Sequence, residues 1–178
     1  MDKIPTEPAD SPGDHQLTNS RTVSVIVSYH GVSGNSWVSG RWDVMGAVAG
    51  KTGETVGQKL IRDDGEARQY LWSGLHVELY RDDADSYYYN LMGERPSLFV
   101  VCRQEADGAL KPVLLTLSYD ETVSYMEVDD AVYSVPMPPE IYRWVERFVL
   151  THYVPEKKKK RKRDDWKEAA GNGRFRGP

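Results

Sequence analysis

The helical pattern of apolar side chains over residues 139–153 constrains the fold more than any other feature of the sequence. Pro139 and Glu140 suit a first helical turn, because proline at that position has no amide hydrogen to leave unpaired. The apolar side chains that follow recur at helical spacing and make a wide stripe, at Ile141, Trp144, Val145, Phe148 and Val149. We therefore expect one strongly amphipathic helix that packs onto, and closes, the core of the domain.

Short alternating runs predict the strands that this helix would cover. In residues 22–29 one face of the pattern is apolar, which is typical of a half-buried strand, with Val23, Val25 and Val27 on that face. A weaker β pattern covers residues 37–48, where Gly40 and Gly46 suggest bulges or close backbone approach. Residues 51–68 are polar and rich in glycine, so we expect a long loop or a hairpin excursion there.

The second half of the chain adds strands and a clear hairpin. A third strand is predicted where apolar residues alternate again, at Leu75, Val77 and Leu79. Two apolar runs, residues 97–104 and 112–118, flank the Asp107-Gly108 pair, which is the strongest hairpin pattern in the sequence. A short strand is expected at residues 131–135.

Two short helices are predicted between these strands. Residues 82–92 would form a helix capped by an aspartate, with Gly93 closing it. Residues 118–127 would form another, capped by Ser118 or Asp120. Together the elements predict an α+β fold, mainly an antiparallel sheet or half-barrel with a C-terminal packing helix.

The charges divide the chain of 178 residues into an acidic body and a basic tail. Residues 1–20 are polar and rich in proline and carry a net charge of −3, so we expect them to be disordered. Residues 21–153 carry −7 and are predicted to form a single globular domain. Residues 154–178 carry +6 and are expected to form a flexible, solvated tail.

Composition predicts a cytoplasmic protein. Cys102 is the only cysteine, which excludes an intramolecular disulfide and fits a reducing compartment. No apolar run approaches the roughly 20 residues that a membrane-spanning helix needs. The N-terminal residues are acidic and rich in proline, where a secretory signal would be basic and then apolar.

The sequence contains no recognisable catalytic or cofactor motif. It lacks a dinucleotide-binding glycine motif, a phosphate loop and a serine nucleophile elbow, and Cys102 falls in an apolar strand pattern where it would be inert. No two histidines have the spacing that would place a metal pair on one helix face. We therefore expect a protein that is not an enzyme and holds no cofactor and no dedicated metal.

One enzymatic alternative remains open, a small metal-dependent enzyme at the acidic residues. Hard cations bind several oxygen ligands, and these could come from Asp82, Asp83, Asp85, Asp129 and Asp130. Helix capping and solvated turns explain the same aspartates without a metal, and we favour that interpretation.

A run of three tyrosines is the candidate partner-binding site. Tyr87, Tyr88 and Tyr89 are adjacent, so at least one of them should face solvent. Surface tyrosine is enriched at binding hot spots, although ordinary core packing would also explain the run. The candidate partner-binding residues are Tyr87, Tyr88, Tyr89, Asp82, Asp83 and Asp85.

An unbroken basic run in the tail is a candidate electrostatic element, formed by Lys157, Lys158, Lys159, Lys160, Arg161, Lys162 and Arg163. Such a run can attract RNA, DNA or an acidic protein surface. No aromatic residue is interleaved with it, and the acidic body would repel phosphates. A tether that assists protein binding is therefore preferred to a nucleic-acid-binding module, which is the alternative function. A solvated tail that serves only solubility would explain the run equally well.

Several linked segments resemble an uncharacterised proteobacterial domain family whose genes lie beside those for molybdenum-dependent formate dehydrogenase and its maturation factors. The segments are RWDVMGAVAG from Arg41, YLWSGLHVELYRDDADSYYYNL from Tyr70, PSLFVV from Pro96, and EVDDAVYSVPMPPEIYRWVERFVLTHYVPEKKKKRKRDDW from Glu127. The resemblance implies a context and no enzymatic mechanism. It leads us to expect a non-enzymatic accessory or maturation factor that binds a formate dehydrogenase subunit or another maturation factor.

Overall fold

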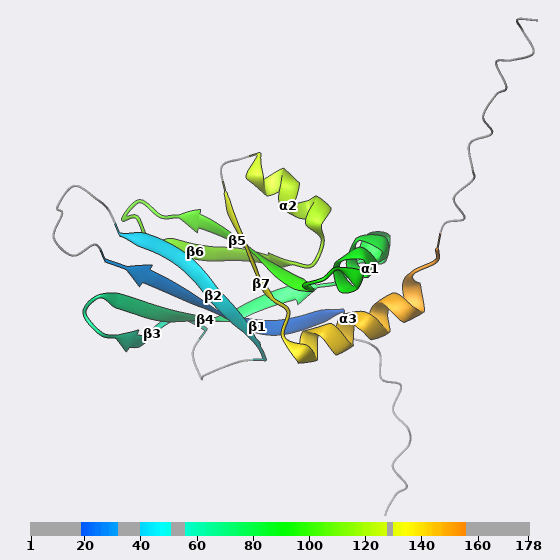
Figure 1. Ribbon diagram of the computed structural model, residues 1–178, viewed down its shortest axis with the longest axis horizontal. Coiled ribbons are helices and arrows are strands. Elements are labelled where there is room, and N and C mark those ends of the chain that lie inside the picture. The colour runs from blue at the N-terminus through cyan, green and yellow to red at the C-terminus, as the bar shows by residue number, and fades with distance from the viewer. Residues whose placement is uncertain (1–18, 32–39, 51–55, 128–129, 156–178) are drawn as a thin grey trace, which may run out of the picture.

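The computed structural model describes residues 19–31, 40–50, 56–127 and 130–155, and Figure 1 shows how their strands and helices are arranged. The strands are β1 Ser20–His30, β2 Arg41–Ala49, β3 Gly57–Asp63, β4 Ala67–Glu78, β5 Ser97–Gln104, β6 Leu110–Thr116 and β7 Ala131–Pro136. The helices are the 3-10 turn η1 Arg81–Asp83, α1 Ala84–Met92, α2 Tyr119–Met126 and α3 Pro139–His152. Within the described residues, no helix has both the length and the apolar character needed to cross a membrane.

The seven strands form one mixed sheet that is nearly closed into a barrel. Their hydrogen-bonded order is β2-β1-β4-β6-β5-β7, and β3 pairs with β4 outside this path. Only β4 and β6 run parallel, meeting at Val77 and Leu115. The two ends of the order, β2 and β7, also contact each other. The predicted α+β fold with a mainly antiparallel half-barrel is therefore confirmed.

The first strand begins one residue earlier than the boundary expected at Arg21. Ser20 pairs with Glu78, and the carbonyl of Asn19 accepts a hydrogen bond of 2.8 Å from the Leu79 amide. The expected disordered tails otherwise lie outside the described residues.

The alternation in β1 is confirmed on its apolar face and differs on the other. Val23, Val25 and Val27 are fully buried, as the pattern predicts. Ser24 and Ser28, on the opposite face, are fully buried as well. β1 lies between β2 and β4, and the Ser24 hydroxyl donates to the Ser73 hydroxyl of β4 at 3.5 Å. Ile26, between these serines on the same face, is partly exposed, so the second face is mixed and the strand is more deeply buried than the pattern predicts.

Both glycines singled out in the second β segment have the expected roles. The pairing of β1 with β2 shifts between Ile26 and Val27, which leaves Met45 as an extra residue beside Gly46. A Cβ atom on Gly40 would lie 2.4 Å from the ring of Tyr29, so the backbone can pass there only as glycine. The first part of the predicted strand, residues 37–39, lies outside the described residues.

Residues 57–63 form a strand where the sequence predicted a long loop or a hairpin excursion. β3 pairs with β4 as an antiparallel ribbon, and the connecting turn is held by Asp64, whose Oδ1 accepts from the Ala67 amide at 2.8 Å. Almost every β3 side chain is exposed, because the strand lies outside the barrel path. The hairpin interpretation is right, and the loop interpretation is wrong because backbone pairing alone forms this strand without an apolar face.

The predicted hairpin at Asp107-Gly108 joins β5 to β6. Gly108 has a positive φ of 82°, and the Glu105 amide donates to the Ala109 carbonyl at 2.8 Å to close the loop. Cys102 on β5 is fully buried, and burial raises the pKa of its thiol to about 12. The predicted burial of Cys102 is confirmed, and its lack of reactivity stays a prediction.

The helix caps follow the predictions only in part. Ser118 caps α2, since its Oγ accepts from the Glu121 amide at 3.4 Å. Asp83 stands at the N-cap of α1, but its side chain makes no capping hydrogen bond, so the predicted aspartate cap is wrong. Gly93 ends α1 with an extended backbone and not a left-handed one. α1 instead continues from the 3-10 turn that precedes it.

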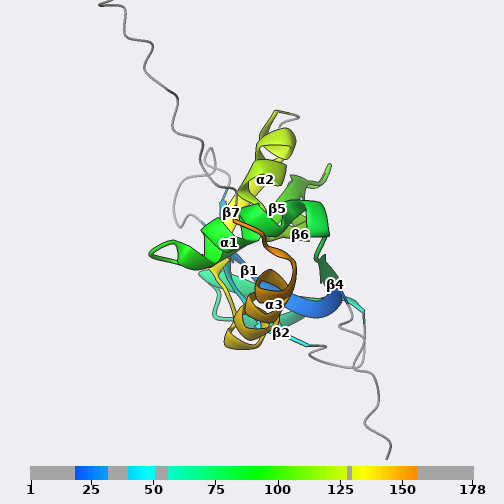
Figure 2. The same cartoon turned by 90° about the vertical axis from the view of Figure 1, so that its right-hand side faces the viewer.

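α3 closes one end of the barrel with its whole predicted stripe, and Ile141, Trp144, Val145, Phe148 and Val149 are all buried in the core cluster. α1 lies beside α3 at this end, while β3 marks the opposite end and α2 lies over β5 and β7 (Figures 1 and 2). The contact between α1 and α3 brings the tyrosine run next to the C-terminal turn of α3.

Candidate functional site

The three tyrosines of α1 have three different environments. Tyr87 is 1% exposed and belongs to the core, Tyr88 is half-buried, and Tyr89 is 63% exposed. An α-helix turns by about 100° per residue, which sends three consecutive side chains in different directions. The candidate contact site therefore keeps Tyr89, while Tyr87 is excluded from it as a core residue.

Tyr87 fixes α1 to the rest of the domain. Its ring makes an edge contact with Phe148 of α3, with centroids 6.1 Å apart, and its hydroxyl accepts a hydrogen bond of 3.2 Å from the Tyr80 amide. Burial raises the pKa of the Tyr87 hydroxyl far above its ordinary value. The hydroxyl is therefore a neutral structural group that fixes the start of α1.

Tyr88 and Tyr153 form a stacked pair between α1 and the residue that follows α3. Their ring centroids are 4.3 Å apart and their planes are inclined by 11°. Tyr89 makes an edge contact with Tyr88, with centroids 5.5 Å apart. The exposed ring of Tyr89 thus rests on a stack that is itself anchored to the end of α3.

A pocket of about 440 Å³ opens beside this stack. Its lining includes three of the predicted site residues, Asp82, Asp85 and Tyr89, together with Arg81, His152 and Tyr153. Asp83 is half-buried and does not line it. The structure therefore brings half of the predicted residues together and leaves Asp83, Tyr87 and Tyr88 outside the pocket lining.

A second hollow, of about 320 Å³, lies on the other side of Tyr89. Asp85 and Tyr89 line both hollows, and the second one adds Tyr119 and Asp120 from the start of α2. Tyr119 is 60% exposed. We call the surface formed by Asp82, Asp85, Tyr89, Tyr119 and Asp120 the α1 surface. It combines two exposed phenol rings with three carboxylates, and Arg81 is the cation beside them.

The described part of the chain ends next to the α1 surface. Val154, which is 79% exposed, lines the same pocket as Asp82 and Tyr89. The seven basic residues from Lys157 to Arg163 lie outside the described residues and begin three positions after Val154. A partner held on the α1 surface would therefore lie within reach of the tail.

The four described aspartates of the proposed cation cluster, Asp82, Asp83, Asp85 and Asp130, are not gathered at one point. Asp130 instead forms an ion pair with Arg103, with Nε to Oδ1 at 3.0 Å and Nη2 to Oδ2 at 2.9 Å. The hydrogen bonds from the Arg103 guanidinium hold the pKa of Asp130 below its ordinary value. In the described ranges no three His, Cys, Asp or Glu side chains are close enough to share a metal ion, and Asp129 lies outside those ranges.

Tyr119, His152 and Tyr153 belong to this site and were missed in the sequence. Tyr153 follows the end of α3, and Tyr119 begins α2, so both lie far from the tyrosine run along the chain. One local signal was available: Phe148 and His152 are four residues apart, and their rings lie 4.4 Å apart on one side of α3. These side chains come together at α1 because three helices pack against one another. No local pattern in the sequence therefore predicts the whole group.

A family model described as "Protein of unknown function (DUF3305)" matches residues 22–162, most of the chain. No curated protein and no solved structure matches the sequence.

Proposed function

Because the chain belongs to the DUF3305 family of proteins of unknown function, no activity comes with the family, and we propose that the domain is a protein-binding accessory factor that uses its α1 surface. The partner is a protein with a basic, partly apolar surface. The resemblance found in the sequence suggests which protein: a subunit of a molybdenum-dependent formate dehydrogenase or one of its maturation factors. The domain acts there without catalysis.

The observation that supports this proposal is the exposure of Tyr89 on a rigid base. An aromatic side chain contributes most to binding when it is already ordered in the free protein, because little conformational entropy is then lost. Tyr89 is 63% exposed, yet it rests on Tyr88, which stacks on Tyr153. The ring is available to a partner without any rearrangement.

The charges of the α1 surface suggest the chemistry of the partner. Asp82 and Asp85 are exposed and line the pocket beside Tyr89, and Asp120 lines the hollow on its other side. Neither Asp82 nor Asp85 makes an ion pair with a described residue. These carboxylates would complement lysine or arginine on a partner, and they would repel a nucleic acid at this surface.

The basic run would serve the same interaction by a different route. Solvated charges outside a contact area mainly raise the association rate and affect dissociation little. Because Lys157 to Lys160 follow Val154 closely in the chain, they would act near the α1 surface. The nucleic-acid alternative assigns recognition to this run and predicts that the α1 surface is dispensable.

Affinity purification of the tagged full chain from a molybdenum-replete native host, with quantitative mass spectrometry, tests the proposal. The variant is Tyr89→Ala, and the control is Leu60→Ala, which removes a 48% exposed apolar side chain on β3 at the opposite end of the domain. We expect a protein retained by wild type and by Leu60→Ala and depleted at least about tenfold with Tyr89→Ala, since hot-spot anchors contribute about 2 kcal/mol or more. Equal recovery with all three proteins, or recovery that depends only on nuclease-sensitive RNA or DNA, would contradict the proposal.

A further inference from the structure

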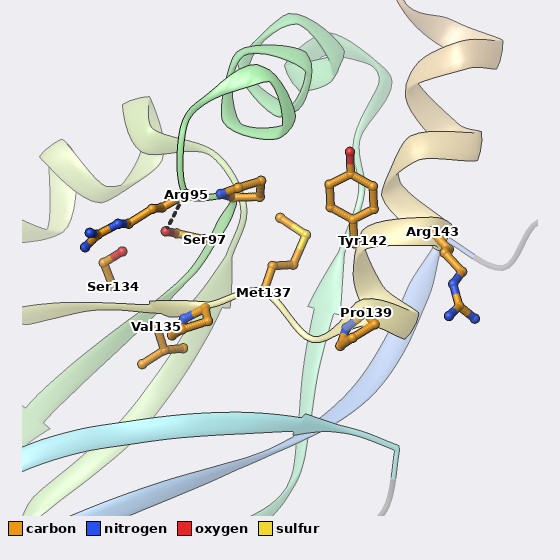
Figure 3. A pocket seen from close by; sticks show the side chains of 10 residues that line it. Arg95, Ser97, Ser134, Val135, Met137, Pro139, Tyr142 and Arg143 are labelled. Atoms are coloured by element: carbon orange, nitrogen blue, oxygen red, sulfur yellow. Dashed lines mark hydrogen bonds between the residues drawn. The ribbon is translucent and has the colours of Figure 1, made fainter.

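A second pocket region lies away from the α1 surface, at the corner where β7 turns into α3. Its volume is about 620 Å³, within the range of about 300 to 1,000 Å³ that is usual for small-molecule sites. Figure 3 shows the side chains that line it, which come from the α1–β5 connection, from β7 and from the first turn of α3. None of the residues predicted from the sequence to form a site belongs to it.

Most of the pocket wall is apolar. Met137 lies between Pro139 and the ring of Tyr142 on one side and Ser134 on the other (Figure 3), and Pro96 also lines the pocket. Met137 is 9% exposed, so its side chain is packed against the core and forms the floor of the pocket. The pocket opens above this side chain. A ligand that fills the pocket would bury an apolar body of about the size of a small ring system.

Two arginines give the pocket its charge. Arg95 lines one end with Ser134, and Arg143 lines the end formed by α3 (Figure 3). Both arginines are exposed, and neither makes an ion pair with a described residue. The lining contains no carboxylate, although residues 21–153 carry a net charge of −7. Two free guanidinium groups and no acid make this pocket complementary to an anion.

The pocket walls are held in place without a ligand. The Met137 amide donates to the Pro96 carbonyl at 3.0 Å, which ties the β7–α3 corner to the α1–β5 connection. Asn90 of α1 exchanges two hydrogen bonds with the Ser97 backbone, at 2.8 and 2.9 Å. The Ser97 hydroxyl donates to the Arg95 carbonyl at 2.8 Å, the dashed line in Figure 3. Such a preformed cavity binds a ligand without the entropy cost of ordering its own walls.

We propose that this pocket binds a small organic molecule that carries an anionic group on an apolar body. The anionic group, a carboxylate, phosphate or sulfonate, contacts the guanidinium group at one end of the pocket, that of Arg95 or that of Arg143, and the guanidinium group at the other end attracts it at longer range. The apolar body lies over Met137 and against Pro96 and Tyr142. The domain then has two separate binding regions, the α1 surface for a protein and this pocket for a small anion.

Two dyes that differ by one anionic group test the proposal on the full chain. Anilinonaphthalene sulfonate has the required form, and phenylnaphthylamine has the same rings without the sulfonate. We expect Arg95→Gln and Arg143→Gln each to weaken binding of the sulfonate dye by up to about fivefold, since exposed charge contacts are worth up to about 1 kcal/mol, and the double variant to weaken it further. Binding of the uncharged dye should not change. Arg147→Gln, one turn further along α3 and outside the pocket lining, is the matched control.

Methionine methyl signals in an NMR spectrum locate the bound dye. The Met137 signal, assigned with Met137→Leu, should move when the sulfonate dye is added. The signals of Met45, Met92 and Met126, all at least 50% exposed and outside the pocket, should stay in place. Ser134→Trp should fill the polar end of the pocket and weaken both dyes. A Met137 signal that does not move, or sulfonate binding that is equal in wild type and in the Arg95→Gln/Arg143→Gln double variant, would overturn the proposal.

Discussion

Tyr88 and Tyr153 stack with ring centroids 4.3 Å apart and planes inclined by 11°, and this pair joins α1 to the residue after α3. The stack lies directly beneath Tyr89, whose ring contacts that of Tyr88. The two tyrosines therefore fix both the position of α1 and the orientation of the exposed ring. The effect of the stack on α1 and the role of the exposed Tyr89 ring can be measured in separate experiments.

Removing the Tyr153 ring should loosen α1 without unfolding the domain. Aromatic pairs contribute about 0.5–1.5 kcal/mol beyond their buried area, so Tyr153→Ala should lower the free energy of unfolding by about 1 kcal/mol or more. Tyr153→Phe keeps the ring and should stay close to wild type. Urea denaturation measures the free energy, and hydrogen exchange of the α1 amides should accelerate in the alanine variant alone. Unchanged α1 exchange in that variant would show that the stack does not hold the helix.

Trp144 should be one of the most costly residues to truncate. It is 5% exposed and belongs to the core stripe of α3, so Trp144→Ala should cost about 3–5 kcal/mol of the about 5–15 kcal/mol available to a domain. Leu150→Ala on the same helix is the control, because Leu150 is 80% exposed and its loss should change stability by at most about 0.5 kcal/mol. Chemical denaturation of both variants checks the contrast, and similar losses in the two would contradict the packing of α3.

The ion pair between Arg103 and Asp130 should make the stability of the domain depend on pH in the acidic range. Hydrogen bonds from Arg103 lower the pKa of Asp130 from its ordinary value of 3.8. The stabilisation of the folded state by this ion pair is therefore complete above that value and is lost as the pH falls through the lower folded-state pKa. Melting temperatures of wild type and Asp130→Asn should therefore differ at neutral pH and converge below the ordinary value. A difference that stays constant or grows in acid would refute this assignment.

Cys102 should be unreactive until the domain unfolds. It is fully buried, and desolvation raises its thiol pKa to about 12, so very little thiolate exists at pH 8, where an ordinary thiol reacts readily. Labelling with a disulfide reagent should be slow in buffer and rapid in concentrated urea. Rapid native labelling would indicate that β5 opens or that the thiol is accessible.

The sequence predicted those parts of the fold that leave a local pattern. The α3 stripe, the valines of β1 and the Asp107-Gly108 turn are each readable within a few residues, because burial or turn geometry requires particular side chains there. β3 left no such pattern, since its side chains are exposed and only its backbone pairs with β4. The predicted aspartate cap of α1 was wrong for another reason. The 3-10 turn before α1 extends the helical backbone across the residue where the sequence placed the start of the helix.

The candidate site was predictable in its position along the chain and not in its composition. The tyrosine run lies in α1, and only packing against α3 decides that Tyr87 is buried and Tyr89 exposed. Tyr153 and Tyr119 join Tyr89 through contacts between distant segments, which no spacing rule reports. The pocket between Arg95 and Arg143 was missed for the same reason, since its two arginines belong to different elements and have no motif.

The division of labour between the α1 surface and the basic run gives the most direct test. Binding kinetics are measured at low and physiological salt between the immobilised full chain and the protein recovered by affinity purification. We predict that Tyr89→Ala raises the dissociation rate at least about tenfold. Replacing Lys157 to Lys160 by glutamine should lower the association rate and its salt dependence while leaving dissociation nearly unchanged. Undiminished binding by Tyr89→Ala, or equally tight binding by an isolated peptide of residues 154–178, would contradict recognition by the α1 surface.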